Sequence, residues 1–104
     1  MAKVKCIIKR PDEQYGHVAN ISVTLENLQK TVGGYIEAVT LAPDIGLIML
    51  VNEEGKLKNM EFNFHCGIDT IVGPAIIIGQ KGEDFGDIPI DLATWKKLLH
   101  SWGN

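Results

Sequence analysis

The sequence predicts an α+β fold: an antiparallel sheet of about five strands, with a short helix after strand two and a C-terminal helix packed on one face. Two observations carry this prediction. Apolar runs of strand length are separated by glycine-rich turns between residues 32 and 87. Residues 91–102 instead repeat their apolar positions at helical spacing. We expect a single domain over residues 1–104, because a chain of this length is too short to form two hydrophobic cores.

The first two strands are predicted from alternating apolar and polar residues. Val4, Cys6 and Ile8 alternate with a set of residues that is mostly lysine, and Pro11 ends the run. Alternation resumes over residues 17–23, after a PDEQYG segment with the composition of a turn. This arrangement favours a hairpin.

A short helix is predicted directly after these strands. The hydroxyl of Thr24 can cap its first turn, and Leu25, Leu28 and Val32 follow at helical spacing. Gly33 is expected to end the helix in the left-handed conformation. We therefore expect the three apolar side chains to lie in the core.

The next two strands are predicted over residues 35–41 and 45–52, with a turn between them at residues 42–44. The run Ile45–Val51 does not alternate. That strand is therefore expected to be covered on both faces or to meet an oligomeric partner. Residues 56–67 show a weak pattern that fits a loop, a short strand or one helical turn.

Residues 71–78 are predicted as a further strand, in which Gly73 and Pro74 favour an edge position or a bulge. A loop over residues 79–87 follows it. Asp91 is expected to cap the final helix, whose apolar face closes over the sheet. That face consists of Leu92, Trp95, Leu98, Leu99 and Trp102.

The composition excludes several classes of function. A formal net charge of -3 offers no basic surface for a phosphate backbone, so strong nucleic-acid binding is not expected. The longest apolar run, Ile45–Val51, is far shorter than the roughly 20 residues of a membrane helix, so no membrane association is expected. The N-terminal MAKVKCIIKR carries charges within its apolar run and fits a strand better than a signal peptide. We expect a cytoplasmic protein in which Cys6 and Cys66 are reduced thiols.

The loop Gly79–Asp87, with the sequence GQKGEDFGD, combines glycines, carboxylates, a lysine and an aromatic ring. It matches neither the phosphate-binding pattern GxxxxGK[ST] nor the twelve-residue calcium loop. Its carboxylates would repel a phosphate unless a divalent ion intervened. An ordinary solvated turn explains this composition better, and a small hydrolase that uses Glu83–Asp87 is kept as an alternative.

Other reactive groups give little support for catalysis. No GxSxG elbow is present, so no serine nucleophile is assigned. Glu37, Glu61 and Asp84 are candidates for an acid and base pair, but the sequence does not give their separation. We assign no catalytic residue.

The soft metal-ligand candidates show no paired spacing, so no metal and no cofactor is expected. These candidates are His17, His65, His100, Cys6 and Cys66.

Aromatic and amide side chains are better candidates for binding. Tyr35 follows two glycines, and Phe85 lies in the charged loop near Gln80 and Lys81. Tyr35 is expected to pack in the core in preference to binding, whereas Phe85 fits either role.

The blocks VGGYIEAVTL, LVNEEGKLKN, DTIVGPAIIIG and GEDF occur in this order, and through them the chain resembles the domain of unknown function 3846 family. The resemblance covers about Leu25 to Phe85. The family consists of small proteins scattered through bacteriophages, plasmids and other mobile elements. The resemblance implies no activity. This sequence departs from the family pattern at Pro74 and at His65-Cys66. The residues at the family's typical positions are Gly33, Gly34, Tyr35, Asn52, Gly55, Gly73, Gly79, Glu83, Asp84 and Phe85.

This genomic setting implies a role in antagonising host defence. We expect a non-enzymatic binding protein of a phage or mobile element, active in the host cell cytosol. It would bind a host protein, such as a CRISPR nuclease, or sequester a small signalling nucleotide between two protomers. A structural protein-interaction module is a further alternative. The apolar runs Ile45–Val51 and Ile76–Ile78 favour a homodimer. The candidate ligand-binding or interaction residues are Gly33, Gly34, Tyr35, Gln80, Lys81, Glu83, Asp84 and Phe85.

Overall fold

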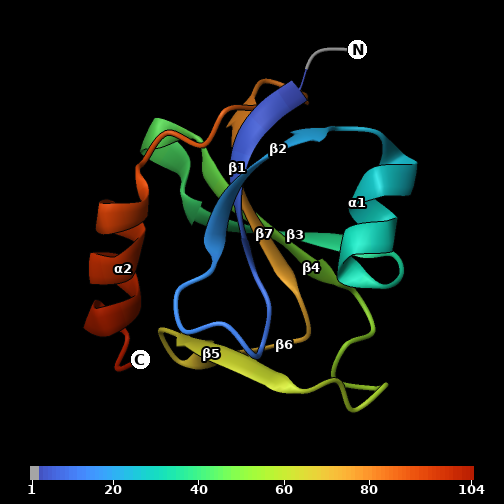
Figure 1. Ribbon diagram of the computed structural model, residues 1–104, viewed down its shortest axis with the longest axis vertical. Coiled ribbons are helices and arrows are strands. Elements are labelled where there is room, and N and C mark those ends of the chain that lie inside the picture. Colours follow the sequence, from blue (N-terminus) through green and yellow to red (C-terminus); the bar gives the residue numbers. More distant parts are fainter. Residues whose placement is uncertain (1–2) are drawn as a thin grey trace.

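The computed structural model describes residues 3–104 and contains a six-stranded antiparallel sheet, a separate two-stranded hairpin and two α-helices (Figure 1). The helices are α1 (Leu25–Val32) and α2 (Leu92–Ser101), and a 3-10 turn (Pro43–Ile45) joins β3 to β4. Met1 and Ala2, the first residues of the MAKVKCIIKR segment, lie outside the described residues. The strands are β1 (Lys3–Lys9), β2 (His17–Ser22), β3 (Ile36–Ala42), β4 (Leu47–Asn52), β5 (Phe62–Cys66), β6 (Asp69–Val72), β7 (Ala75–Lys81) and β8 (Asp84–Gly86).

The six-stranded sheet is assembled from two hairpins with a later strand between them. Its order is β2-β1-β7-β4-β3, and β8 pairs with the end of β7. β1 pairs with β2 and β3 with β4, while β7 pairs antiparallel with both β1 and β4. The predicted α+β class, with a short helix after the second strand and a C-terminal helix, is confirmed. The sheet holds six strands where about five were expected, and the β5–β6 hairpin adds two outside it.

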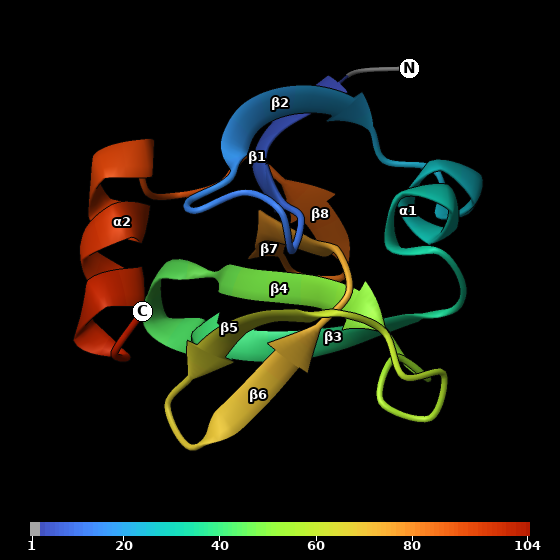
Figure 2. The same cartoon turned by 60° about the horizontal axis from the view of Figure 1, so that its bottom comes forward.

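Each face of the sheet has its own hydrophobic core. α2 and the β5–β6 hairpin cover one face, and α1 covers the opposite face (Figures 1 and 2). β4 is buried at all its positions, because Leu47, Met49 and Val51 contact the first core while Ile48 and Leu50 contact the second. The prediction of a strand covered on both faces is confirmed.

The two apolar runs that favoured a homodimer are covered within one chain. Residues 47–51 and 76–78 are buried, whereas Ile45, in the turn before β4, is 48% exposed. The absence of alternation in these runs therefore follows from the two cores. It requires no second protomer.

α1 forms where it was predicted. The Thr24 hydroxyl oxygen accepts a hydrogen bond from the backbone of Asn27 at 3.1 Å, and Gly33 ends the helix with a φ of 83°. Leu28 and Val32 are buried, but Leu25 is 61% exposed, so its predicted place in the core is wrong. The helix contacts β3 and β4 through its later residues, and its first turn lies outside this contact.

α2 carries the predicted apolar face. Its cap is the Asp91 carboxylate, which accepts a hydrogen bond from the backbone of Thr94 at 2.8 Å. Trp95 and Leu99 are buried. Phe64 of β5 packs edge-on against Trp95, with ring centroids 5.7 Å apart, which attaches the hairpin to the helix. The half-buried residues of the face are Leu92, Leu98 and Trp102.

The predicted strand over residues 71–78 is instead two strands. β6 ends at Val72, Gly73 turns the chain with a φ of 72°, and β7 begins after Pro74. The expected edge position or bulge is wrong, because β7 is a central strand. Pro74 precedes the ladder and therefore removes no hydrogen bond from it. The proline marks the point where the chain passes from the hairpin into the sheet.

Two further segments differ from their prediction. Residues 56–67, which gave no clear pattern, contain turns followed by β5. The predicted loop over residues 79–87 is largely the β7–β8 hairpin, and its tight turn uses Gly82 with a φ of 61°. Charged residues conceal this hairpin in the sequence because its tip, residues 80–84, faces solvent.

A buried lysine ties the β5–β6 hairpin to the sheet. Lys9 of β1 is 3% exposed, and its ammonium donates to the side-chain oxygen of Asn63 at 2.6 Å and to the carbonyl of Glu13 at 2.7 Å. The Asn63 amide donates in return to the carbonyls of Lys9 and Gly73, both at 2.8 Å. Burial lowers the pKa of Lys9, and the carboxylates of Glu13 and Asp12 oppose this shift.

Replacing Asn63 by leucine should leave this ammonium short of an acceptor. We expect Asn63→Leu to lower the free energy of unfolding by about 3 kcal/mol in urea denaturation. Because the two side chains interact directly, Lys9→Met and Asn63→Leu should couple by about 1 kcal/mol or more in a double-mutant cycle. Strictly additive effects on the free energy of unfolding would show that the two side chains do not stabilise each other. Lys5→Met, at an exposed lysine of the same strand, is the control.

Gly79 should tolerate no side chain. A Cβ at Gly79 would overlap the carbonyl oxygen of Asp87, whereas a Cβ at its paired residue Gly86 would meet nothing nearer than the flexible Lys81 side chain, at 3.5 Å. We expect Gly79→Ala to lower the free energy of unfolding by about 2 kcal/mol, and Gly86→Ala by less than about 0.5 kcal/mol. Equal losses in thermal or chemical unfolding would contradict this account.

Candidate functional site

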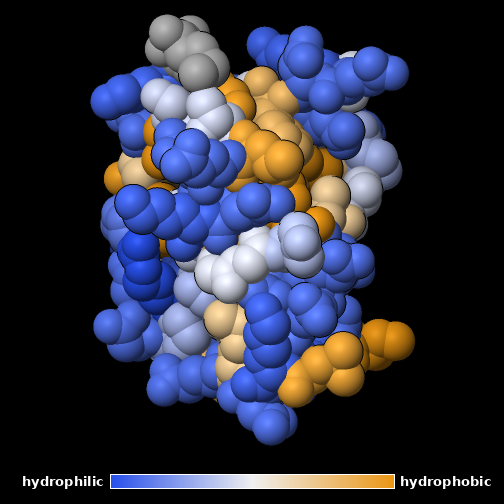
Figure 3. All heavy atoms as spheres, turned by 90° about the vertical axis from the view of Figure 1, so that its right-hand side faces the viewer, coloured by the Kyte–Doolittle hydropathy of each residue, from blue (hydrophilic) through white to orange (hydrophobic). Residues whose placement is uncertain are grey.

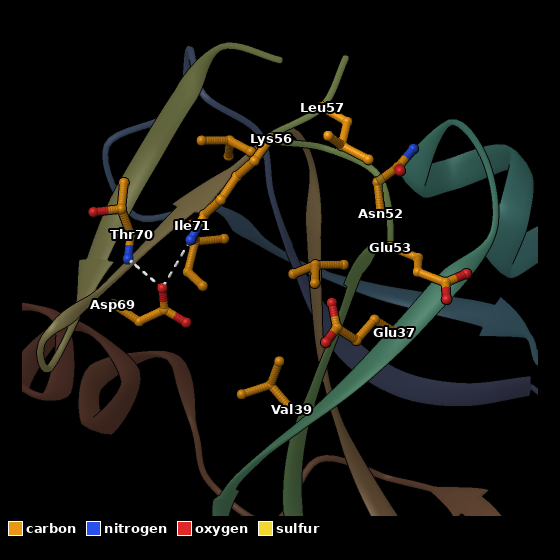
Figure 4. A pocket seen from close by; sticks show the side chains of 11 residues that line it. Glu37, Val39, Asn52, Glu53, Lys56, Leu57, Asp69, Thr70 and Ile71 are labelled. Carbon is orange, nitrogen blue, oxygen red and sulfur yellow. Dashed lines mark hydrogen bonds and ion pairs between the residues drawn. The ribbon is translucent and has the colours of Figure 1, made fainter. Parts of the chain in front are cut away.

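A cavity of about 200 Å³ lies between the β3–β4 part of the sheet and the β5–β6 hairpin (Figure 4). Three segments form its walls: β3, the end of β4 with the turn that follows it, and β6. The residues that line it are Glu37, Val39, Val51, Asn52, Glu53, Lys56, Leu57, Asp69, Thr70, Ile71 and Val72.

The inner walls of the cavity are apolar. Glu37 and Val39 are two residues apart on β3, so both side chains project from the same face of the sheet. Val51 is the partner of Glu37 in the β3–β4 ladder, and it belongs to the first core together with Ile71 of β6. A ligand in the cavity would therefore contact aliphatic side chains as well as charged groups.

An ion pair crosses one side of the cavity. The Lys56 ammonium lies 3.0 Å from Oδ1 of Asp69, which also accepts a hydrogen bond from the backbone of Thr70 at 2.8 Å (Figure 4). The hydrogen bond from Lys56 is the main cause of the lowered pKa of Asp69, and the bond from Thr70 adds to it. Both side chains are more than half exposed, so solvent screens the pair and it adds little to stability.

Glu37 faces this pair from the other wall. Figure 4 shows its carboxylate pointing into the cavity, with the second oxygen of Asp69 directed toward it across the gap. Glu53 lies on the same rim as Glu37 but is turned away from the centre. Within residues 3–104, neither glutamate forms an ion pair. The lining thus carries three carboxylates and one ammonium, which favours a cation and opposes a phosphate.

Asn52 has a structural task at the edge of the cavity. It is 5% exposed, and its amide donates to the carbonyl of Val32 at 3.2 Å while its oxygen accepts from the backbone of Glu54 at 2.8 Å. In Figure 4 this amide is turned toward α1 and away from the cavity. The residue fixes the turn that presents Glu53 and Lys56.

The predicted binding residues fall into two separate groups. Gly33, Gly34 and Tyr35 join α1 to β3, and the Tyr35 carbonyl accepts from the backbone of Glu53 at 2.8 Å, at the end of β4. Tyr35 is 65% exposed, so its expected place in the core is wrong, because it lies just before β3 in a segment that no element covers.

The second group lies on the β7–β8 hairpin, at the other end of β4, where the Gln80 backbone donates to the Gly46 carbonyl at 2.8 Å. Phe85 is half-buried and packs on the second core. The six residues of β4 separate the two groups, so they form no common pocket within one chain. The exposed members of the second group are Gln80, Lys81, Glu83 and Asp84.

The sequence contained one usable indication of the cavity. Cys66 and Asp69 are paired across a two-residue connection whose Gly67 has a φ of 63°, which is the turn chemistry of a tight hairpin. Recognising it would have placed β5 and β6. Nothing in the sequence, however, pairs Glu37 with Asp69, because the two belong to elements that are not hydrogen-bonded to each other.

Neither cysteine is assigned to a candidate site. Cys6 is buried, and burial raises its pKa to about 11. Cys66 is half-buried, and its pKa is raised by burial and by the nearby charge of Asp69. Both thiols are free. Over the described part of the chain, no three histidine, cysteine or acidic side chains gather in a way that would hold a metal ion.

The fold and site define a small α+β protein with a charged cavity between its sheet and a separate hairpin. Residues 4–100 match the family described as a domain of unknown function (DUF3846), and the chain belongs to this family. No curated protein and no solved structure matches it. Among residues 3–104 there is no helix with the length and apolar character needed to cross a membrane.

Removing the partner of Asp69 should raise its pKa. The lowered pKa means that ionised Asp69 contributes to stability above its unfolded pKa, and that this contribution is lost as the pH falls through the folded pKa. We expect Lys56→Gln to move the NMR titration midpoint of the Asp69 carboxyl upward. Lys58→Gln, two residues along the same turn, should leave it in place. An unchanged midpoint in Lys56→Gln would show that the ion pair does not form in solution.

Proposed function

We propose that this chain is a non-enzymatic binding protein of a phage or mobile element, which antagonises host defence by binding a host protein in the cytosol. The observation that carries the proposal is the cavity beside the β5–β6 hairpin, together with the apolar side chains exposed on this hairpin and on the turn after β4. The mobile-element setting of the family supports the choice of a host-defence target.

Large apolar side chains are exposed on the turn after β4 and on the β5–β6 hairpin. Leu57, which lines it, is 83% exposed, Ile68 at the tip of the hairpin is fully exposed, and Phe62 of β5 is 48% exposed. Figure 3 shows apolar surface at the lower edge of the molecule, at the height of β5 and the turn before it, bordered by hydrophilic surface. Exposed apolar side chains bordered by polar surface are typical of protein contacts.

A second candidate is sequestration of a nucleotide between two protomers. The exposed ring of Tyr35 beside Gly33 and Gly34 favours it, because an aromatic face and glycine backbone donors suit a base and a phosphate. In a symmetric dimer, Phe85 of the second protomer would have to complete the site. The carboxylates of Glu83 and Asp84 on the same hairpin oppose the phosphate.

The proposal is tested at Leu57. We expect Leu57→Ser to reduce by at least about tenfold the plating efficiency that the chain restores to a phage on a defence-carrying host, since truncating a central interface residue costs more than about 1.4 kcal/mol. Leu25→Ser, at a leucine exposed on α1, is the matched control and should act as wild type. Equal activity of both variants would overturn the assignment of this surface. Loss of activity in Tyr35→Ala alone would favour the nucleotide.

A further inference from the structure

The lining of the cavity favours an elongated cation as its ligand. Its charged groups stand on opposite walls: Glu37 on β3 points into it, and Asp69 on β6 directs its second oxygen across the gap (Figure 4). Lys56 already occupies Oδ1 of Asp69, which leaves a net negative lining around the open space. A guanidinium has several donors in one plane and can bind two carboxylates at once, whereas an ammonium is a point charge.

The apolar walls fix the rest of the ligand. Val39 and Ile71 flank the space between the two carboxylates, so methylenes next to the charged group of a ligand would contact these side chains (Figure 4). An arginine side chain combines both parts, because its apolar stem ends in a planar cation. A bare ion would leave the aliphatic walls without a partner.

The rim indicates that this side chain belongs to a protein. Leu57 lines the cavity and is also 83% exposed, so a molecule that entered the cavity would meet an apolar group outside it. A free amino acid would instead place its own charged ends against this leucine. A protein partner covers Leu57 with its surface while one of its arginines enters the cavity.

We infer that the cavity between β3 and β6 receives an arginine side chain of the partner protein, with its guanidinium between Glu37 and Asp69. This inference rests on the proposed function, and it names the group that the partner contributes. Glu37 is the main recognition residue, since its carboxylate has no ion-pair partner within the described residues.

The test uses a short blocked peptide, acetyl-Gly-Arg-Gly-amide, titrated into the ¹⁵N-labelled full chain. We expect amide shifts to gather at Glu37, Val39, Asp69 and Ile71. The same peptide with citrulline, which keeps the shape and removes the charge, should leave these amides unmoved. Shifts that are scattered over all acidic surfaces, or equal for both peptides, would overturn the inference.

Two variants with the same change in net charge separate the site from the general field of the protein. Glu37→Gln should weaken binding of the arginine peptide about tenfold, because one charge-assisted bidentate contact is lost. Glu83→Gln, on the β7–β8 turn, should leave it unchanged. Equal effects of the two variants would assign the binding to net charge and overturn the site. Both variants are exposed substitutions, and thermal unfolding checks that each is folded.

The source of the cation and the proposed function are tested apart. Free arginine that bound as tightly as the blocked peptide would make this a small-molecule site and overturn the partner arginine. If the Leu57→Ser variant lost its activity on the host while the arginine peptide failed to bind the wild-type chain, the proposed function would stand and this inference would fall. If the peptide bound while Leu57→Ser acted as wild type on the host, the cavity would stand as an arginine site and the proposed function would fall.

Discussion

β7 is the strand on which the rest of the structure depends. It pairs with β1 on one side and with β4 on the other, and β8 folds back on its end. Without β7 the β1–β2 and β3–β4 hairpins would not be hydrogen-bonded to each other, and neither core would pack on a continuous sheet. Its apolar residues 75–78 are fully buried, so they contribute hydrophobic stabilisation to both faces at once. Because β7 follows both hairpins by many residues, the sheet closes through long-range pairing, which makes this step costly in chain entropy and slow.

The cavity is a by-product of the way the chain enters β7. The β5–β6 hairpin precedes this strand, and it leaves the sheet because Gly73 and Pro74 stop the ladder between β6 and β7. Lys9 and Asn63 hold the hairpin to β1 at one side, and the contact between Phe64 and Trp95 holds it to α2. Where it diverges from β3 and β4, a charged space remains open. The same residues that complete the first core thus also shape the candidate site.

Local sequence patterns determine most of the fold and little of the site. The apolar run in β4, the cap at Thr24 and the stop at Gly33 are consequences of burial and backbone geometry near in sequence, and each could be read directly. The sequence indicates a break at Pro74 but not its structural role, because a proline before a central strand and a proline in an edge strand give the same local pattern. The chemistry of Tyr35 predicts a place in the core, yet the absence of any element above it leaves it exposed. The meeting of Glu37 with Asp69 depends on where a separate hairpin lies, which residue spacing does not encode.

The two layers that cover the sheet are unequal. α2 and the hairpin close the first core with a cluster of aromatic rings, whereas α1 closes the second with the side chains of Leu28 and Val32. A helix of eight residues has little stability of its own and stays folded through these two contacts. The α1 side should therefore open at a lower free energy than the α2 side, and its amides should exchange with solvent sooner than those of β4 and β7. Since Gly33 to Tyr35 follow α1 directly, the first group of predicted binding residues would be released with it. The cavity would be affected too, because the Asn52 amide donates to the Val32 carbonyl and the Glu53 backbone donates to the Tyr35 carbonyl.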